Sequence, residues 1–278
     1  MKKLFDDISY ASSRITTKTY STSFSFGILV LHKSLRQSIY NIYGFVRFAD
    51  EIVDTFHEYD KHILFNKFKD DTFCAIANKI SLNPILNSFQ ETVNTYSIDL
   101  SLINHFLDSM EMDLRERRYN KESYNDYIHG SAEVVGLMCL KTFVNGNEKL
   151  YNKLKPSAMS LGSAFQKINF LRDANVDYSL LGRSYFPGVQ LDNFTQSDKI
   201  NIEKDIEKDF KDALVGIQML PSSSRGGVYL SYLYYYHLFK KVKRLSPSKI
   251  LEERIRIPNL EKMVLMFKAS FKNQFNLI

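Results

Sequence analysis

The chain has 278 residues, of which 37 are Lys or Arg and 31 are Asp or Glu, so its formal net charge at pH 7 is +6. With 44% hydrophobic residues and only 11 Gly and 6 Pro, the sequence is too apolar for a disordered chain and has too few turn residues for a many-stranded β protein. The small positive charge favours anionic substrates or an anionic membrane surface and gives no reason to expect a nucleic acid partner. We expect an all-α protein with a single domain over residues 1–278.

The predicted elements are helices along the whole chain, separated by short breaks at Pro, Gly, Asn and Ser residues. The hydrophobic periodicity predicts helices at residues 6–18, 33–56, 60–80, 85–96, 99–117, 121–145, 148–179, 196–219, 226–244 and 259–275. The Pro-Ser-Ser-Ser-Arg-Gly-Gly segment at residues 221–227 is predicted to be a flexible turn.

The N-terminal residues carry charges where a signal peptide needs an apolar run, and no later stretch approaches the ~18 consecutive apolar residues of a transmembrane helix. Cys74 and Cys139 are isolated, which is typical of a reduced intracellular protein without a zinc site. We therefore expect a cytoplasmic protein, with peripheral association to an anionic membrane as an addition. The basic run at residues 240–244 is the candidate for lipid contact, although such a run is most often a solvated helix face.

The predicted helix at 33–56 carries the first polar stripe. Because each residue turns a helix by ~100°, four polar side chains fall on a strip about 60° wide. These are Tyr43, Arg47, Asp50 and Asp54. Apolar residues surround the stripe, so two carboxylates lie four residues apart in a buried setting, which costs several kcal/mol unless a cation or protons neutralise them. The pattern therefore indicates a metal ion.

The predicted helix at 148–179 repeats the design, with a polar strip about 80° wide. Its members are Gly162, Gln166, Asn169, Asp173 and Asp177. If the two helices face each other, they bring carboxylate and amide oxygens together and no His or Cys. Such oxygen ligands suit Mg²⁺, which normally completes its coordination with water and phosphate. The sequence thus predicts a diphosphate ligand, with Arg47 and Arg172 placed to bind phosphate oxygens.

These residues resemble the squalene/phytoene synthase family. The first stripe matches the pattern Tyr-x-x-x-Arg-x-x-Asp-x-x-x-Asp, and the second matches Gln-x-x-Asn-x-x-Arg-Asp-x-x-x-Asp. Further matching pieces follow in order over nearly the whole chain: Ser23-Phe24, Tyr127 with Ala132 and Gly136, residues 182–187, and Arg254. Two positions depart from the pattern, since Tyr20 stands where relatives often carry a small residue or His, and Val176 replaces a common acidic residue.

The resemblance implies an isoprenoid-synthase fold, in which a central cavity lies between two facing aspartate-rich helices. It also implies Mg²⁺, with Mn²⁺ as a substitute, and no redox cofactor. The implied metal ligands are Asp50, Asp54, Asn169, Asp173 and Asp177. The implied catalytic residues are these five together with Tyr43, Arg47, Tyr127 and Arg172. The implied substrate-binding residues are Ser23, Phe24, Ala132, Gly136, Gly162, Gln166, Arg183, Tyr185 and Arg254.

The implied reaction, most like that of the bacterial phytoene branch, is the head-to-head (1'-1) condensation of two geranylgeranyl diphosphates through prephytoene diphosphate to phytoene. The 17 Tyr and 21 Phe offer aromatic faces for cation–π stabilisation of carbocations, although most of them, including those at residues 229–236, are expected to pack the core. Two alternatives stay open. One is dehydrosqualene or squalene formation from farnesyl diphosphate, and the other is a non-catalytic assembly factor with the same fold.

Overall fold

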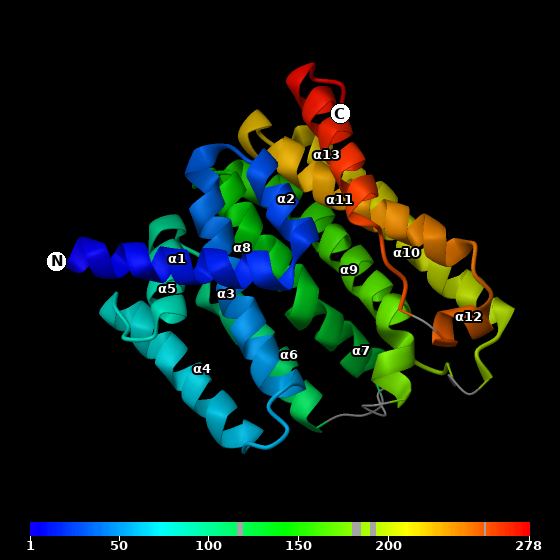
Figure 1. Ribbon diagram of the computed structural model, residues 1–278, viewed down its shortest axis with the longest axis horizontal. Helices are drawn as coiled ribbons and strands as arrows, with labels where there is room; N and C mark the ends of the chain where they lie inside the picture. Colours follow the sequence, from blue (N-terminus) through cyan, green and yellow to red (C-terminus); the bar gives the residue numbers. More distant parts are fainter. Residues whose placement is uncertain (116–118, 180–184, 190–192, 253) are drawn as a thin grey trace.

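The structure, a computed structural model, describes residues 1–115, 119–179, 185–189, 193–252 and 254–278, without the side chains of residues 176–179. The regular elements of these residues are all helical, which confirms the predicted fold class (Figure 1). The α-helices are α1 (Lys2–Tyr20), α2 (Thr22–Val30), α3 (Lys33–Asp54), α4 (Lys61–Asn78), α5 (Pro84–Tyr96), α6 (Leu100–Arg115), α7 (Lys121–Ile128), α8 (Val134–Phe143), α9 (Glu148–Ser179), α10 (Gln196–Met219), α11 (Ser222–Lys243), α12 (Pro247–Glu252) and α13 (Asn259–Gln274). A π-helical turn, η1 (His129–Glu133), joins α7 to α8.

Three features of the helix pattern differ from the sequence-based prediction. The short helices α2 and α12 were not predicted, and η1 interrupts what was predicted as one helix at 121–145. The predicted flexible turn at 221–227 is wrong, because α11 begins at Ser222. A Cβ atom on Gly227 would lie 2.6 Å from the Gly27 carbonyl oxygen, so glycine at this position permits α11 to cross α2 closely.

The apolar core has two parts. One cluster, from α3, α5, α6 and α8, surrounds Phe45, whose ring stacks on that of Phe89 with 3.9 Å between centroids. The second cluster, from α9, α10 and α11, includes Ile168, Phe210 and Leu230, each at most 1% exposed. Residues of both clusters border one internal cavity, so the packing of the two parts gives the cavity its walls. Within the described residues, no helix is long and apolar enough to cross a membrane.

Candidate active site

A cavity of about 920 Å³ lies between α2, α3, α8, α9 and α11. Sixteen of the eighteen residues that the sequence singles out line this cavity: Ser23, Phe24, Tyr43, Arg47, Asp50, Asp54, Tyr127, Ala132, Gly136, Gly162, Gln166, Asn169, Arg172, Asp173, Tyr185 and Arg254. The side chain of Asp177 and the whole of Arg183 lie outside the described residues. The two polar stripes therefore contribute to one space, although their chemical roles stay predictions.

The cavity opens to solvent where its lining residues are exposed. Among the residues that the structure describes, these are Tyr20, Thr22, Arg254, Arg256 and Asn259. All other described lining residues are buried or half-buried. Arg254 and Arg256 come from the segment between α12 and α13, and Asn259 is the first residue of α13. The other two come from the junction of α1 and α2. Entry to the cavity therefore runs past two guanidinium groups.

The first stripe is held by α3, whose opposite face is anchored by the buried side chains of Phe45, Ala49 and Val53. Arg47 forms ion pairs with Asp50 and with Glu51. Its guanidinium also lies over the ring of Tyr20, 4.2 Å from the ring centroid, which is a cation–π contact. The unusual residue Tyr20 thus helps to hold Arg47 at the cavity wall.

The carboxyl of Asp50 has a raised pKa in this stripe. Burial raises its pKa most strongly, and the neighbouring Asp54 raises it further, to about 7, against a lowering effect of Arg47. The side chain is 34% exposed, and Asp50 lines the cavity, so the exposure is to the cavity interior. At neutral pH this carboxyl is therefore poised between its two forms, and a cation placed in the cavity would favour the ionised one.

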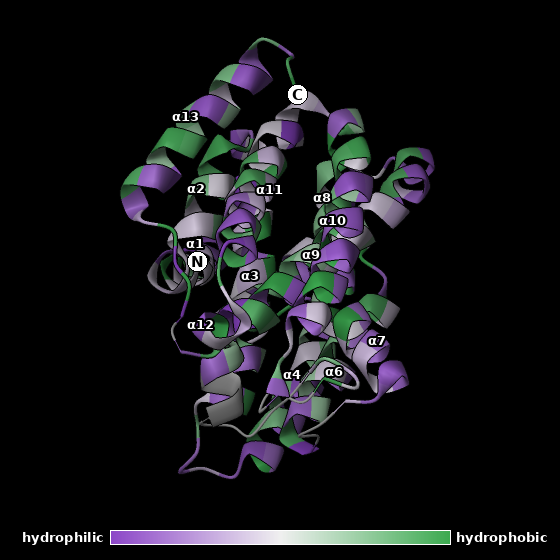
Figure 2. Cartoon of the chain, turned by 90° about the vertical axis from the view of Figure 1, so that its right-hand side faces the viewer, coloured by the Kyte–Doolittle hydropathy of each residue, from purple (hydrophilic) through white to green (hydrophobic). Residues whose placement is uncertain are grey.

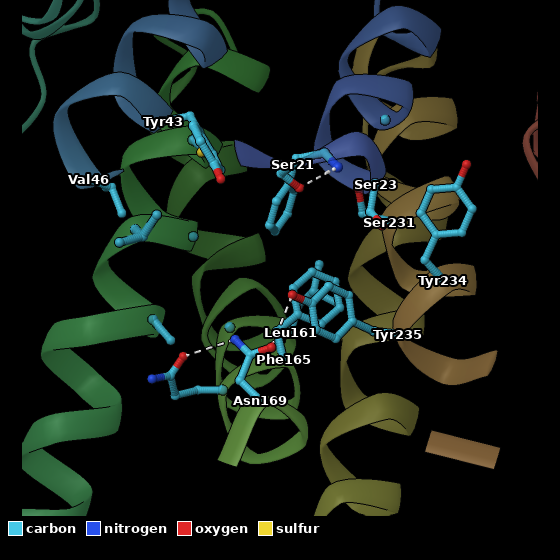
Figure 3. A pocket seen from close by; sticks show the side chains of 18 of the residues that line it. Ser21, Ser23, Tyr43, Val46, Leu161, Phe165, Asn169, Ser231, Tyr234 and Tyr235 are labelled. Carbon is cyan, nitrogen blue, oxygen red and sulfur yellow. Dashed lines mark hydrogen bonds between the residues drawn. The ribbon is translucent and has the colours of Figure 1, made fainter. Parts of the chain in front are cut away.

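The second stripe is held by α9 and is joined to residues from distant parts of the chain. The Asp173 carboxylate accepts hydrogen bonds from Arg172 Nε at 3.0 Å and forms an ion pair with Arg254 Nε at 2.8 Å. The Tyr235 hydroxyl donates to the Asn169 side-chain oxygen at 3.3 Å, and Asn169 Nδ2 donates to Gln166 Oε1 at 3.4 Å (Figure 3). Polar groups from α9, α11 and residue 254 therefore meet on one wall.

Three small residues that the sequence assigned to substrate binding have a packing role in the structure. A Cβ atom on Gly162 would lie 2.6 Å from the Ala132 carbonyl oxygen, and one on Gly136 would lie 3.0 Å from the Ala158 carbonyl oxygen. These positions allow α9 to approach η1 and α8 closely. They shape the cavity wall by bringing backbones together.

Asp113 is a cavity residue that the sequence analysis missed. Its side chain is buried on α6 and accepts hydrogen bonds from the Tyr127 hydroxyl at 2.6 Å and the Tyr119 hydroxyl at 3.1 Å. The signal was present in the sequence, because Phe106, Met110 and Asp113 follow one another at helical spacing. A carboxylate in the apolar row of a predicted helix indicates a functional or hydrogen-bonded position.

Lys262 and Arg256 were also missed, and they add positive charge near the opening. Lys262 Nζ donates a hydrogen bond to Thr22 Oγ1 at 2.7 Å. Burial lowers the pKa of this ammonium, and the nearby charges of Arg172 and Arg256 lower it further. Cations crowded together in this way form a site that favours a multiply charged anion such as a diphosphate.

Aromatic rings make up much of the remaining wall. The ring of Phe165 stacks on Tyr235 with 3.8 Å between centroids, and Phe24 lies 5.7 Å from Tyr43 (Figure 3). Burial raises the pKa of Tyr43 to about 12, so its hydroxyl stays protonated at physiological pH. Residues 229–236, expected to pack the core, do so in part, but Tyr234 and Tyr235 also line the cavity.

Four oxygen donors on the cavity wall could hold a metal ion. Among the described residues, no three His, Cys, Asp or Glu side chains are already arranged as a metal site. The oxygen donors on the cavity wall, Asp50, Asp54, Asn169 and Asp173, are of the type that Mg²⁺ prefers. Because Asp54 and Asp113 both raise the pKa of Asp50, these three carboxylates repel one another, and a divalent cation bound between them would relieve the repulsion. The donor chemistry therefore fits Mg²⁺.

Comparisons with known proteins identify the family from the sequence and the fold from solved structures. The sequence model of the squalene/phytoene synthase family matches residues 17–261. A phytoene synthase of Arthrospira platensis is 25% identical, covering 95% of this chain and 93% of its own length. Among solved structures, a dehydrosqualene synthase superposes with a TM-score of 0.82 at 18% identity, over 97% of this chain and 98% of its own. A squalene synthase of Alicyclobacillus acidocaldarius superposes with a TM-score of 0.75 at 20% identity, over 85% of this chain and 93% of its own.

Proposed function

Because this chain belongs to the squalene/phytoene synthase family, a group of prenyltransferase-type enzymes of isoprenoid biosynthesis, we propose that it joins two isoprenoid diphosphates head to head. The proposed substrate is geranylgeranyl diphosphate and the proposed product is phytoene, formed through prephytoene diphosphate. The observation that carries the proposal is one cavity that combines a cationic opening with an aromatic interior of about 920 Å³. The relatives named phytoene synthase support the choice of substrate.

Binding of the charged end of the substrate is assigned to the cations around the opening. Arg172 donates to Asp173, Arg254 forms an ion pair with the same carboxylate, and Lys262 donates to Thr22, so all three cations have oxygen partners at the cavity. A diphosphate that enters would take these donors over, because charge-assisted hydrogen bonds to phosphate oxygens are short and strong. Arg47 and Ser23 are the proposed contacts from α3 and α2.

Mg²⁺, or Mn²⁺ in its place, would supply positive charge to the departing diphosphate. The residues that would hold the metal ion are Asp50, Asp54, Asn169, Asp173 and Asp177. The chain itself provides the rest of the environment. When the carbon–oxygen bond of one substrate breaks, an allylic cation remains, and the double bond of the second substrate attacks it with loss of a proton to form a cyclopropyl diphosphate. The second diphosphate then leaves, the carbon skeleton rearranges and another proton is lost. The product is phytoene, with its three conjugated double bonds.

Such cations are destroyed by water, so the interior has to stay dry and chemically inert. The rings of Phe24, Tyr43 and Phe165 line this space, and the high pKa of Tyr43 keeps its hydroxyl from acting as a nucleophile. Aromatic faces stabilise a nearby cation by about 0.5–2 kcal/mol each without forming a bond to it. The cavity therefore has the chemistry that a carbocation reaction requires.

The test is incubation of the purified chain with Mg²⁺ and either geranylgeranyl or farnesyl diphosphate, without a reductant. We expect a C40 product from the first substrate, identified as phytoene by its mass and its count of conjugated double bonds. A C30 product from farnesyl diphosphate alone would instead establish the dehydrosqualene alternative. No turnover of either substrate by a folded, Mg²⁺-loaded chain would favour the non-catalytic alternative.

A further inference from the structure

Helix α13 carries apolar side chains on its outer face. Six exposed apolar side chains, between 42% and 74% exposed, form this face: Leu260, Met263, Val264, Phe267 and Phe271 on α13, and Phe275 at its C-cap. At ~100° per residue these six fall on a strip about 120° wide, called here the outer stripe of α13. In both views α13 lies on the outside of the molecule (Figures 1 and 2).

The opposite side of the same helix is already occupied by the protein. Leu265, Met266 and Ala269 pack against the second core cluster. A surface helix normally presents polar residues on the side away from the core, so a second apolar side is unusual. Single exposed apolar residues need no explanation, but a continuous row of this kind marks an interaction surface.

Charge identifies the kind of partner. Residues 240–278 contain ten Lys and Arg against three Asp and Glu, a net charge of +7, whereas the whole chain carries +6. Essentially all of the net positive charge therefore lies in this segment. The exposed Lys268 lies beside one edge of the outer stripe, at about 80° around the helix from Leu260, whereas Lys272 turns inward and donates to the Tyr229 hydroxyl at 3.4 Å. Docking of a second copy on this face would bring two such segments together, and their repulsion disfavours it.

The outer stripe begins beside the cavity opening, on the same helix. Asn259 and Lys262, in the first turn of α13, line the cavity, and Lys262 donates to Thr22 at the opening. The run at residues 240–244, where the sequence suggested lipid contact, is partly engaged elsewhere, since Lys241 pairs with Glu261 and Lys243 with Glu207. The exposed apolar surface near the opening thus belongs to α13.

We propose that α13 is a membrane-docking helix that lies on an anionic phospholipid bilayer. The outer stripe enters the boundary between headgroups and acyl chains, and the exposed Lys268 contacts the headgroups. In this orientation the cavity opening adjoins the bilayer, from which a diphosphate with a long isoprenoid tail can pass into the cavity. The last step rests on the proposed function, but the docking itself does not.

The test is flotation of the full chain with vesicles of phosphatidylcholine alone and of phosphatidylcholine mixed with phosphatidylglycerol. The variant F267S/F271S removes two rings of the outer stripe. The matched control, I63S/L82S, removes two exposed apolar side chains at a distance from α13, on α4 and just before α5. We expect the unchanged chain and the control to float with the anionic vesicles, and the α13 variant to partition about tenfold less.

Equal flotation of the α13 variant and the unchanged chain would overturn the proposal, as would equal binding of the unchanged chain to both vesicle types. So would an unchanged chain that stays off vesicles but forms a dimer by light scattering, with F267S/F271S returning it to a monomer. A second measurement separates docking from catalysis: F267S/F271S should turn over detergent-dispersed substrate at the normal rate and vesicle-embedded substrate more slowly. Absence of all turnover would refute the proposed function, while flotation would still decide the role of α13.

Discussion

The Tyr127 hydroxyl donates a 2.6 Å hydrogen bond to the carboxylate of Asp113, which links α7 to α6 inside the cavity wall. Burial raises the pKa of Tyr127, and the charge of Asp113 raises it further, so the phenol stays a donor. The ring lies among those of Tyr119, Phe170 and Tyr185, with centroids 5.1 to 5.9 Å away. Asp113 thus fixes an aromatic group at the cavity wall.

The first prediction concerns this pair. Replacement D113A should lower the free energy of unfolding by about 1–3 kcal/mol, because two buried hydroxyls lose an acceptor. D113N keeps an acceptor oxygen, so it should lower the free energy of unfolding less than D113A does. Urea denaturation measures both, and equal stability of the unchanged chain and D113A would contradict this account of Asp113.

The second prediction concerns the two acidic stripes. D50N and D173N should each lower kcat by about a hundredfold or more, because each removes a charge from the diphosphate-binding wall. Far-UV circular dichroism should show the same helix content. The control is D108N, an exposed carboxylate on α6 that pairs with Lys69 away from the cavity, and it should retain normal turnover. Full activity in D50N or D173N would contradict the assigned roles.

The third prediction follows from the raised pKa of Asp50. Between its ordinary value of 3.8 and about 7, the folded chain holds a proton that the unfolded chain has lost. The contribution of this carboxyl to stability therefore falls as the pH rises through that range. D50N should flatten the pH dependence of stability there. Mg²⁺, which binds the ionised form, should raise Tm more at about pH 8 than at about pH 5.5.

A thermal melt with and without Mg²⁺ measures both effects. An equal Mg²⁺ shift at the two pH values, or a D50N variant with an unchanged pH slope, would show that Asp50 is not the titrating ligand.

The fourth prediction concerns the crossing of α2 and α11. In G227A the new methyl group would lie 2.6 Å from the Gly27 carbonyl oxygen and 2.5 Å from Leu31 Cδ2. We expect a loss of about 1–3 kcal/mol in the free energy of unfolding, since neither backbone can move without repacking. S222A, at the exposed start of the same helix, serves as the control. G227A with unchanged stability would mean that the two helices can separate.

The sequence predicted the parts of the site that depend on one helix at a time. The bounds of α9 agree with the prediction, and both polar stripes line the cavity, because helical periodicity places residues four apart on one face. It could not predict the ion pair of Arg254 with Asp173, since that pair depends on how distant segments fold together. Local propensity predicts a turn at the Gly226-Gly227 pair, because it does not reveal that two helices cross closely there.

Periodicity also cannot tell an apolar residue that packs inward from one that faces outward. Leu265 and Phe267 of α13 are both apolar, yet the first packs on the core and the second is 66% exposed. Only the positions of α11 and α2 beside α13 decide between the two. The outer stripe therefore became visible in the folded chain alone.

The most direct test of the central claim is the stoichiometry of diphosphate release from geranylgeranyl diphosphate in the presence of Mg²⁺. If both ionisations take place in this cavity, two diphosphates are released for each C40 molecule formed, and chelation of Mg²⁺ stops the release. Release of a single diphosphate per C40 product would contradict the proposed second step, and release without any C40 product would contradict the head-to-head reaction itself.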